Sequence, residues 1–344
     1  MIRFECDYAE GAHPLILERL LETNLVQTPG YSEDEYCTRA ASRIKKLCGD
    51  ESSQVHFFTG GTIVNLTVIA SMLKSYEGVV SADTGHINVH ETGAIEATGH
   101  KVLSIPSLDG KITGAAVERM YLSHIEDHAH EHMTAPGMVY ISHPTENGTI
   151  YTKKELEDLS AVCRKHSLPL FMDGARLGYG LASPGNELEI SDIARLCDAF
   201  YIGGTKVGAL FGEALVITND SFKKNFRYYM KQRGALLAKG RMLGIQFDVL
   251  FENGLYMEIA KNAINNAMLI KEACERKGFK FLYDSPTNQQ FPILPDEIVK
   301  ALAKKYAFYQ WKKTDNAHTA VRFCTSWATT KENTVSLVKD IEAL

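Results

Sequence analysis

Between about residues 55 and 218, short and continuously apolar runs alternate with longer stretches in which apolar positions recur at a helical period. The short runs are typical of strands buried on both faces, and the longer stretches are typical of amphipathic helices. This alternation predicts an α/β fold with a mostly parallel central sheet between helices. The expected strands are residues 55–58, 78–82, 101–105, 137–142, 169–172, 199–202 and 214–217.

The helices expected around these strands carry apolar positions on one side and turn residues at their ends. Pro14 starts the first helix, and Gly49 ends the second. The expected helices are residues 14–25, 33–48, 63–76, 90–98, 115–131 and 153–166, followed by a short helix that opens at Asp192.

The pattern changes after about residue 220. Two long helical stretches are predicted at residues 221–252 and 255–276, and the tail then reads as strand, strand, helix, strand and helix. We therefore divide the chain into three parts. They are an N-terminal segment that packs with the small domain (1–30), a large domain (31–250) and a small α+β domain (251–344).

Composition and charge exclude several classes of protein. Lys and Arg total 37 against 42 Asp and Glu, and a net charge of −5 offers no positive surplus for nucleic acid or anionic membranes. No segment approaches the ~20 apolar residues of a membrane span, and the N-terminus lacks the apolar run of a signal peptide. Seven scattered cysteines without a CxxC pair are typical of reduced thiols. We expect a cytoplasmic protein that binds neither nucleic acid nor membrane.

Polar residues follow five of the expected strands. In an open parallel sheet, ligands bind at the carboxyl ends of the strands, so these five clusters predict one shared site. The clusters are Gly60–Thr62, Asp83–His86, Pro144–Glu146, Asp173–Arg176 and Gly203–Lys206.

The Gly60-Gly61-Thr62 cluster precedes a predicted helix. Backbone amides at the start of that helix and the Thr62 hydroxyl are suited to a phosphate, because glycine permits close approach. The motif has neither the GK[ST] ending of a P-loop nor the GxGxxG of a dinucleotide fold, so a plain strand-to-helix turn is the alternative.

Lys206 and Glu213 are the two charged residues in an otherwise apolar, Gly or Thr stretch from Ala199 to Thr218. A desolvated lysine has a lowered pKa and becomes a usable amine nucleophile, whereas the alternative is a lysine that reaches the solvent from a loop.

Asp173 directly follows a buried strand, and a buried carboxylate needs a cationic partner. Arg176 is one candidate for that partner, and a protonated pyridine nitrogen is the other. A lysine Schiff base together with an aspartate on the pyridinium is the usual protein equipment for pyridoxal phosphate (PLP).

Two further residues are candidates for this chemistry. His86 ends a strand, where an imidazole can stack on a pyridine ring or move a proton, although a lone histidine there is more often structural. Arg322 stands in an apolar strand, either as a clamp for a carboxylate or as a surface residue of an edge strand.

Two charged clusters are interpreted as solvated surface. The first is His124, His128, His130 and His132, which lack an HExxH motif and are interleaved with acidic residues. The second is a basic helical face with two tyrosines among residues 223–233, for which nucleic acid is the weaker interpretation. No metal site is predicted.

With these residues assembled, the sequence resembles the low-specificity L-threonine aldolase/β-eliminating lyase family of PLP enzymes, which have the aspartate-aminotransferase fold (fold type I). The resemblance extends over nearly the whole chain. Its matching stretches are Gly60–Asn65, Ala82–His86 with Glu91–Ala94, Met172–Leu177, the Lys206 loop and Val321–Phe323.

The resemblance implies a role for each matching residue, and it makes residues 31–250 the PLP-binding domain. Lys206 would carry PLP as a Schiff base, Asp173 would keep the pyridine nitrogen protonated, and His86 would stack on the ring. The remaining implied contacts are Gly61 and Thr62 to the phosphate, Arg176 to the cofactor and the substrate carboxylate, Arg322 to that carboxylate, and Asp7 and Tyr31 to the substrate. Tyr31 would act in the site of a neighbouring subunit, because active sites in this fold lie at the interface of a homodimer or homotetramer.

The implied reaction is PLP-dependent retro-aldol cleavage of L-threonine, L-allo-threonine and related β-hydroxy-α-amino acids to glycine and an aldehyde. Many family members carry a histidine where this chain has Thr145, so either His86 or a water near Glu146 is the expected base for the β-hydroxyl. β-Elimination or transamination on the same scaffold is the alternative. A more distant alternative is a non-catalytic protein that binds phosphate or nucleic acid.

Overall fold

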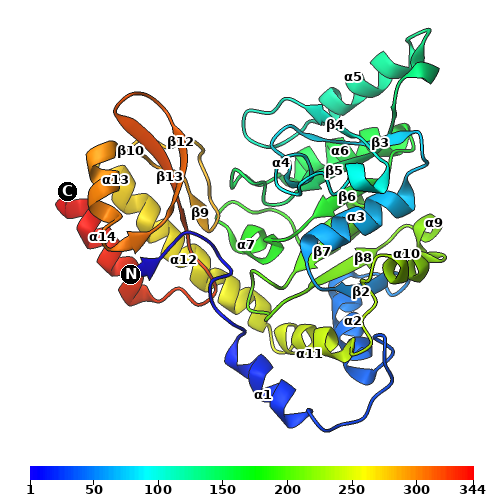
Figure 1. The fold of residues 1–344 in the computed structure, drawn as a ribbon, viewed down its shortest axis with the longest axis horizontal. Coiled ribbons are helices and arrows are strands. Elements are labelled where there is room, and N and C mark those ends of the chain that lie inside the picture. The colour runs from blue at the N-terminus through cyan, green and yellow to red at the C-terminus, as the bar shows by residue number, and fades with distance from the viewer.

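The computed structural model describes all 344 residues and is organised around a seven-stranded sheet. The strands lie in the order β2-β8-β7-β6-β5-β3-β4 (Figure 1). Their bounds are β2 (Gln54–Phe58), β3 (Glu77–Ala82), β4 (Val102–Ile105), β5 (Ala135–Ser142), β6 (Leu170–Asp173), β7 (Ala199–Gly203) and β8 (Glu213–Ile217).

Five neighbouring strands, from β7 to β4, run parallel to one another, which confirms the predicted mostly parallel sheet. The exception is β8, which pairs antiparallel with both β7 and β2. Because β8 runs the opposite way, its first residue, Glu213, lies at the edge where the parallel strands end, opposite Gly203.

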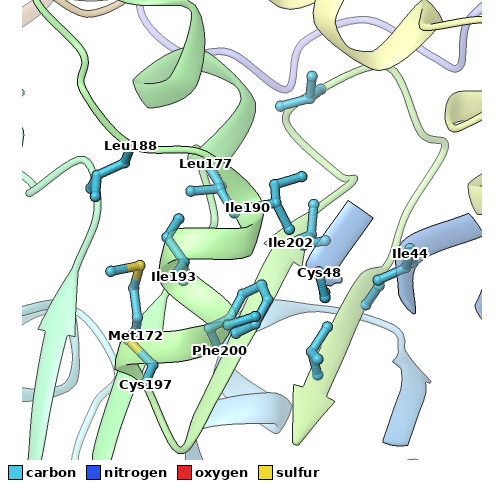
Figure 2. Packing of buried hydrophobic residues seen from close by; sticks show 14 of the residues in the cluster. Ile44, Cys48, Met172, Leu177, Leu188, Ile190, Ile193, Cys197, Phe200 and Ile202 are labelled. Carbon is cyan, nitrogen blue, oxygen red and sulfur yellow. The ribbon is translucent and has the colours of Figure 1, made fainter. Parts of the chain in front are cut away.

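Successive strand residues face different sides of the sheet, and both sides are covered by helices. Met172 and Phe200 belong to one buried cluster, and their neighbours Phe171 and Tyr201 belong to the other. Figure 2 shows Ile190 and other side chains of the first cluster. Burial on both faces explains why these strands read as continuously apolar.

The helices of this part are α2 (Glu35–Cys48), α3 (Gly61–Met72), α4 (His86–Val89), α5 (Gly114–Ile125), α6 (Lys153–Lys165), α7 (Leu177–Ala182), α8 (Ile190–Leu196), α9 (Asp220–Lys223), α10 (Phe226–Gln232) and α11 (Arg241–Leu250). Helices α2, α3, α5, α6 and α8 follow the predicted positions with shifted ends, whereas the short helices α4 and α7 were not predicted.

Two helix predictions are wrong. The stretch 90–98 contains only a 3₁₀ turn at Glu96–Thr98, because Thr92 and Gly93 both have positive φ, which an α-helix does not allow. The stretch 221–252 is three helices, α9, α10 and α11, instead of one. It is interrupted at Asn225 and Gly234, which also have positive φ.

The C-terminal part is a small antiparallel sheet with helices packed on it (Figure 1). The long helix α12 packs against both α7 of the large sheet region and α14. The elements are α12 (Leu255–Arg276), β9 (Gln289–Gln290), β10 (Ile293–Pro295), α13 (Asp296–Leu302), β11 (Tyr306–Ala307), β12 (Tyr309–Lys313), β13 (His318–Cys324) and α14 (Lys331–Ala343).

The N-terminal residues contact both parts of the molecule. Strand β1 (Ile2–Arg3) pairs in parallel with β11, whereas α1 (Pro14–Glu22) packs against α11. The division of the chain at residues 30 and 250 therefore stays a prediction. No helix combines the length and the apolar character that a membrane span requires.

Candidate active site

The carboxyl edge of the seven-stranded sheet holds a cavity of about 270 Å³. All five predicted clusters contribute to its wall, because the strands that precede them end at this edge. The lining residues are Tyr8, Thr59, Gly60, Gly61, Thr62, His86, Ser142, Pro144, Glu146, Asp173, Ala175, Arg176, Tyr201, Thr205, Lys206 and Glu213.

Asp173, the last residue of β6, is buried and ionised. Its Oδ2 accepts hydrogen bonds from Tyr140 (2.6 Å) and Asn65 (3.1 Å), and its Oδ1 accepts from Tyr201 and from the Ala175 N–H (3.0 Å). Burial alone raises the pKa of this carboxyl, but the charge of His86 and the bonds from the tyrosines outweigh it, so the pKa is lowered. No lysine or arginine is ion-paired with Asp173.

His86 begins α4 and is connected to Asp173 through two other side chains. Its Nδ1 lies 2.8 Å from Glu91 Oε1, and Asn65 Nδ2 donates both to that oxygen (2.7 Å) and to Asp173. Burial lowers the pKa of His86, but the hydrogen bond to Glu91 and the charges of Asp173 and Glu146 more than compensate, so the pKa is raised. Because Glu91 takes Nδ1, Nε2 is the ring nitrogen left for a ligand.

The Lys206 amine has no hydrogen bond or ion pair within the chain, although it lies in the wall of the cavity. Burial and the neighbouring charge of Arg176 lower its pKa, against the opposing charges of Asp7, Asp173 and Glu213. An amine in this state is a better nucleophile near neutral pH than an exposed lysine.

Glu213 is the second buried carboxyl at this edge. It accepts hydrogen bonds from the Thr205 hydroxyl (2.9 Å) and the Gly204 N–H (3.1 Å). Burial raises its pKa to about 8, since no ion pair offsets the cost of the charge. Asp173 on β6 and Glu213 on β8, two strands separated by β7, therefore have opposite pKa shifts.

The start of α3 faces the cavity through Gly60, Gly61 and Thr62. Val64 makes the first intrahelical bond, to the Gly60 carbonyl, so the N–H groups before it form an open first turn that can receive an anion. Gly61 is required here for packing as well. A Cβ at this position would lie 2.8 Å from the Tyr201 hydroxyl that binds Asp173.

Arg176 does not pair with Asp173, so the simple ion-pair interpretation of that aspartate is wrong. Arg176 instead makes a bidentate pair with Asp7, with Nε to Oδ2 at 2.7 Å and Nη2 to Oδ1 at 3.0 Å. Asp7 is fully buried and also accepts from Asn288 (2.9 Å). Burial raises the pKa of Asp7, but the charge and hydrogen bonds of Arg176 outweigh it, so the pKa is lowered. Asp7 therefore stands behind Arg176 and lines neither cavity, and its expected contact with a substrate stays a prediction.

A second cavity of about 360 Å³ adjoins the first, with Lys206, His86, Glu146, Arg176 and Tyr8 in the walls of both. Its far wall comes from the small sheet and holds Arg322, Tyr309, Trp311 and Gln289, with His90 completing the lining. The predicted candidate Arg322 thus lies across this space from Lys206.

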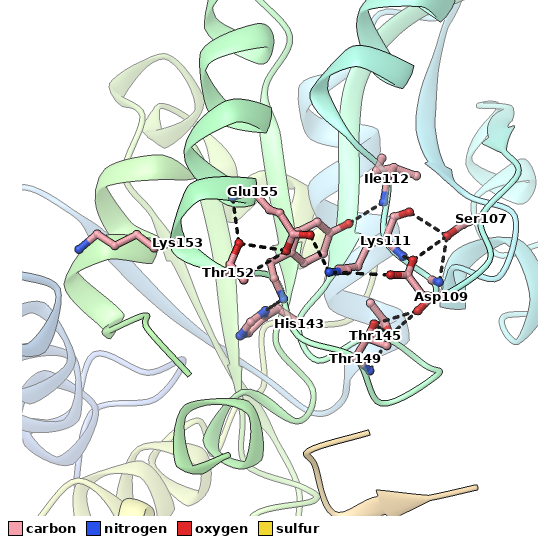
Figure 3. Close-up of polar contacts among 12 residues, drawn as sticks. Ser107, Asp109, Lys111, Ile112, His143, Thr145, Thr149, Thr152, Lys153 and Glu155 are labelled. Carbon is pink, nitrogen blue, oxygen red and sulfur yellow. Dashed lines mark hydrogen bonds and ion pairs between the residues drawn. The ribbon is translucent and has the colours of Figure 1, made fainter. Parts of the chain in front are cut away.

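The loop after β5 places Glu146 rather than Thr145 in the site. Thr145 Oγ1 lies 2.7 Å from Thr149 Oγ1, and both hydroxyls bond to the Asp109 carbonyl (Figure 3). Glu146 faces both cavities and accepts from Ser142 (2.6 Å) and the His86 N–H (3.0 Å). Burial raises the pKa of Glu146, and the bond from Ser142 offsets this only in part.

Tyr31 lies outside both cavities of its own chain. It is 42% exposed, and the Lys231 amine lies 4.7 Å from the centre of its ring. The predicted histidine cluster is on the surface, with His128, His130 and His132 exposed. No group of three or more potential ligands is arranged to hold a metal ion.

Several site residues were missed by the sequence reasoning. Glu213 had a signal, because it was one of two charged residues in an apolar stretch. Asn65 and Glu91 lay inside the stretches that carried the family resemblance, but without a role. Tyr140, Tyr201, Tyr309 and Trp311 resembled ordinary strand aromatics, and no signal distinguished them.

Comparison with known proteins agrees with this geometry. Residues 16–296 match the protein family described as beta-eliminating lyase. The low-specificity L-threonine aldolase of Pseudomonas sp. (strain NCIMB 10558) is 30% identical over 347 residues, which cover 99% of this chain and 97% of that protein.

Solved structures agree as well. The threonine aldolase of Leishmania major superposes with a TM-score of 0.97 and is 44% identical, over 100% of this chain and 99% of the other. A mutant aspartate aminotransferase of Thermus thermophilus superposes with a TM-score of 0.74 at 14% identity, over 100% of this chain and 91% of the other, which shows the fold alone. The predicted aspartate-aminotransferase fold is confirmed.

Proposed function

The chain belongs to the β-eliminating lyase family, and on that premise we propose that it is a PLP-dependent aldehyde-lyase. It cleaves L-threonine, L-allo-threonine and related β-hydroxy-α-amino acids to glycine and an aldehyde. The relatives named threonine aldolase support this substrate class.

One observation carries the proposal. A buried, ionised Asp173 that pairs with no lysine or arginine and an unpaired Lys206 amine line the same cavity. A carboxylate buried in this way costs free energy unless a positive group meets it, and a protonated pyridine nitrogen supplies that group. The residues therefore fit PLP. Lys206 would carry it as a Schiff base, Asp173 would face the ring nitrogen, and Gly61 and Thr62 at the start of α3 would bind the phosphate.

When bound, PLP accepts the electron pair that remains on Cα after the Cα–Cβ bond breaks. Arg322, with Arg176 beside it, holds the substrate carboxylate and so fixes which bond to Cα is broken. Asp7 keeps the Arg176 guanidinium in place through its two hydrogen bonds.

His86 has two tasks in this proposal. Its ring would stack on the cofactor, and in the neutral imidazole Nε2 would take the proton of the β-hydroxyl, while Glu91 holds Nδ1. Glu146 is the alternative proton acceptor, because it faces both cavities.

The active unit is a homodimer or homotetramer with shared sites in this proposal, and Tyr31 serves the neighbouring subunit. Its exposure and its distance from the cavities of its own chain support that assignment. The cytoplasm is the proposed location, and the seven free thiols support it.

Product analysis tests the proposal. The purified holoenzyme is incubated with L-threonine and L-allo-threonine, and glycine, acetaldehyde, ammonia and 2-oxo acids are quantified, with Lys206→Ala as the control. Glycine and acetaldehyde in equal amounts are expected. Ammonia with 2-oxobutanoate would identify an eliminating lyase, and a 2-oxo acid formed with an aminated cofactor would identify an aminotransferase.

A further inference from the structure

The wall of the second cavity that holds Arg322 is aromatic. The guanidinium carbon of Arg322 lies 5.4 Å from the ring centres of both Tyr309 and Trp311. The two rings are 5.9 Å apart and nearly perpendicular, with an interplanar angle of 73°. Both distances lie within the range of about 6 Å in which a ring face attracts a cation.

This arrangement lies at an irregularity of β12. Tyr309 pairs directly with Arg322 across the hairpin, and the pairing then shifts between Gln310 and Lys312, so that Trp311 is the extra residue of a β-bulge. A bulge redirects a side chain, and here Trp311 joins Tyr309 at the guanidinium. Phe291 packs edge-on against the indole at 5.1 Å, which limits its movement.

None of the other contacts of Arg322 neutralises its positive charge. Nη1 donates to Gln289 (3.1 Å) and Nη2 donates to the Glu5 carbonyl (2.9 Å), and both acceptors are neutral. No carboxylate of the chain pairs with Arg322, and its buried Nε has no hydrogen-bond partner. The aromatic rings therefore hold a cation that still lacks its anion.

We propose that Tyr309 and Trp311 are positioning residues that hold the guanidinium plane of Arg322 ready for the substrate carboxylate. The inference rests on the proposed function, in which Arg322 binds that carboxylate. An arginine side chain has many rotamers, so two rings that select one orientation reduce the entropy lost when the carboxylate binds.

The test compares two small amines that differ in the carboxylate. Binding of glycine and of ethylamine to the holoenzyme is followed by the change in visible absorbance, for wild type, Trp311→Ala, Trp311→Phe, Tyr309→Leu and Arg322→Ala. Trp311→Ala is expected to weaken glycine binding about tenfold and to raise the KM for L-threonine with little change in kcat. Ethylamine binding and the affinity for PLP stay unchanged, and Trp311→Phe recovers most of the glycine affinity.

The double variant Trp311→Ala with Arg322→Ala separates a positioning role from general packing. Glycine binding by the double variant is expected to equal that of Arg322→Ala alone, because the rings act through the guanidinium. The inference would be overturned if Trp311→Ala weakened glycine binding and ethylamine binding equally. It would also be overturned if Trp311→Ala still weakened glycine binding by the full factor in a chain that already carried Arg322→Ala. Tyr309 is 53% exposed, so Tyr309→Leu provides a second variant if Trp311→Ala does not fold. If Arg322→Ala alone leaves glycine binding unchanged, Arg322 does not bind the carboxylate, and the proposed role of Arg322 is wrong before that of the two rings is tested.

Discussion

The two ends of the site are assembled in different ways. At the sheet edge, Asp173 ends β6 and Lys206 follows the neighbouring strand β7, and hydrogen bonds from Asn65, Tyr140 and Tyr201 fix the aspartate. At the opposite end, Arg322 belongs to the small sheet and bonds to the carbonyl of Glu5, 317 residues away in the sequence.

This difference separates two functions. The sheet edge is a rigid scaffold that sets the charge of a few groups in advance, which is the arrangement that electrostatic stabilisation requires. The other end depends on contacts between the two extremities of the chain, and in the proposed function it recognises the substrate carboxylate. Changes at the sheet edge should therefore lower kcat, whereas changes at the other end should raise KM.

Lys206→Ala should have the largest effect. Steady turnover should be lost, because no other lysine lies in the wall of either cavity. Turnover and thermal unfolding are measured together, and an unchanged Tm is expected. Turnover at the wild-type rate would remove Lys206 from the mechanism.

Asp173→Asn should lower kcat per bound cofactor by roughly 10²–10³-fold, since the amide cannot hold a positive charge on the ring nitrogen. The side chains have nearly the same size, so packing should change little. The assay is kcat per mole of bound PLP, with the melting curve as control. A stable variant with wild-type kcat would show that the charge of Asp173 is not used.

Asp7→Asn tests the link between the two ends. It leaves the largely buried Arg176 without its counter-charge, and the loss of one partner of a buried pair costs about 3–5 kcal/mol of unfolding free energy. Denaturant unfolding measures the loss. The matched control is Glu10→Gln, which removes one charge from an exposed side chain nearby and should change stability little. Equal stabilities of the two variants would contradict this role of Asp7.

Arg322→Ala should lower kcat/KM by about 10²-fold, mainly through KM, with normal PLP content. Steady-state kinetics and cofactor absorbance are the measurements. Unchanged kinetics would mean that Arg322 is only a residue of the small sheet. A loss of PLP would mean that the two ends are not separable.

Glu213→Gln should have the smallest effect, and it should depend on pH. Because the pKa of Glu213 is raised to about 8, its contribution to stability is present at low pH and is lost as the pH rises through 8. Glutamine does not titrate, so the unfolding free energy of the variant relative to that of wild type should rise by roughly 1–3 kcal/mol between pH 6 and pH 9. Thermal unfolding of both apoproteins at the two pH values checks this. A difference in stability between variant and wild type that does not vary with pH would contradict it.

The sequence reveals the sheet edge better than the other end. Asp173 ends an apolar strand, and His86 and Lys206 come a few residues after apolar strands, so the topology of a parallel sheet brings them together. The partner of Arg176 could not be predicted, because Asp7 reaches it only through the pairing of β1 with β11 in the folded chain. The bulge at Trp311 could not be predicted either. The register of a hairpin is set by contacts between its strands, and the period of apolar residues does not reveal them.

The two wrong helix predictions have a local cause. Thr92, Asn225 and Gly234 adopt positive φ inside stretches whose apolar period continues, so the period predicts a helix that the backbone does not form. Residues other than glycine adopt that conformation seldom, and the surrounding contacts decide where they do.

The proposed function requires that the free Lys206 amine, in the same cavity as the ionised Asp173, carries the cofactor. Borohydride reduction of the holoenzyme, followed by peptide mapping with mass spectrometry, tests it most directly. We expect one pyridoxyl group per chain, on Lys206. A reduced adduct on another lysine, or a holoenzyme in which borohydride fixes no cofactor, would contradict it.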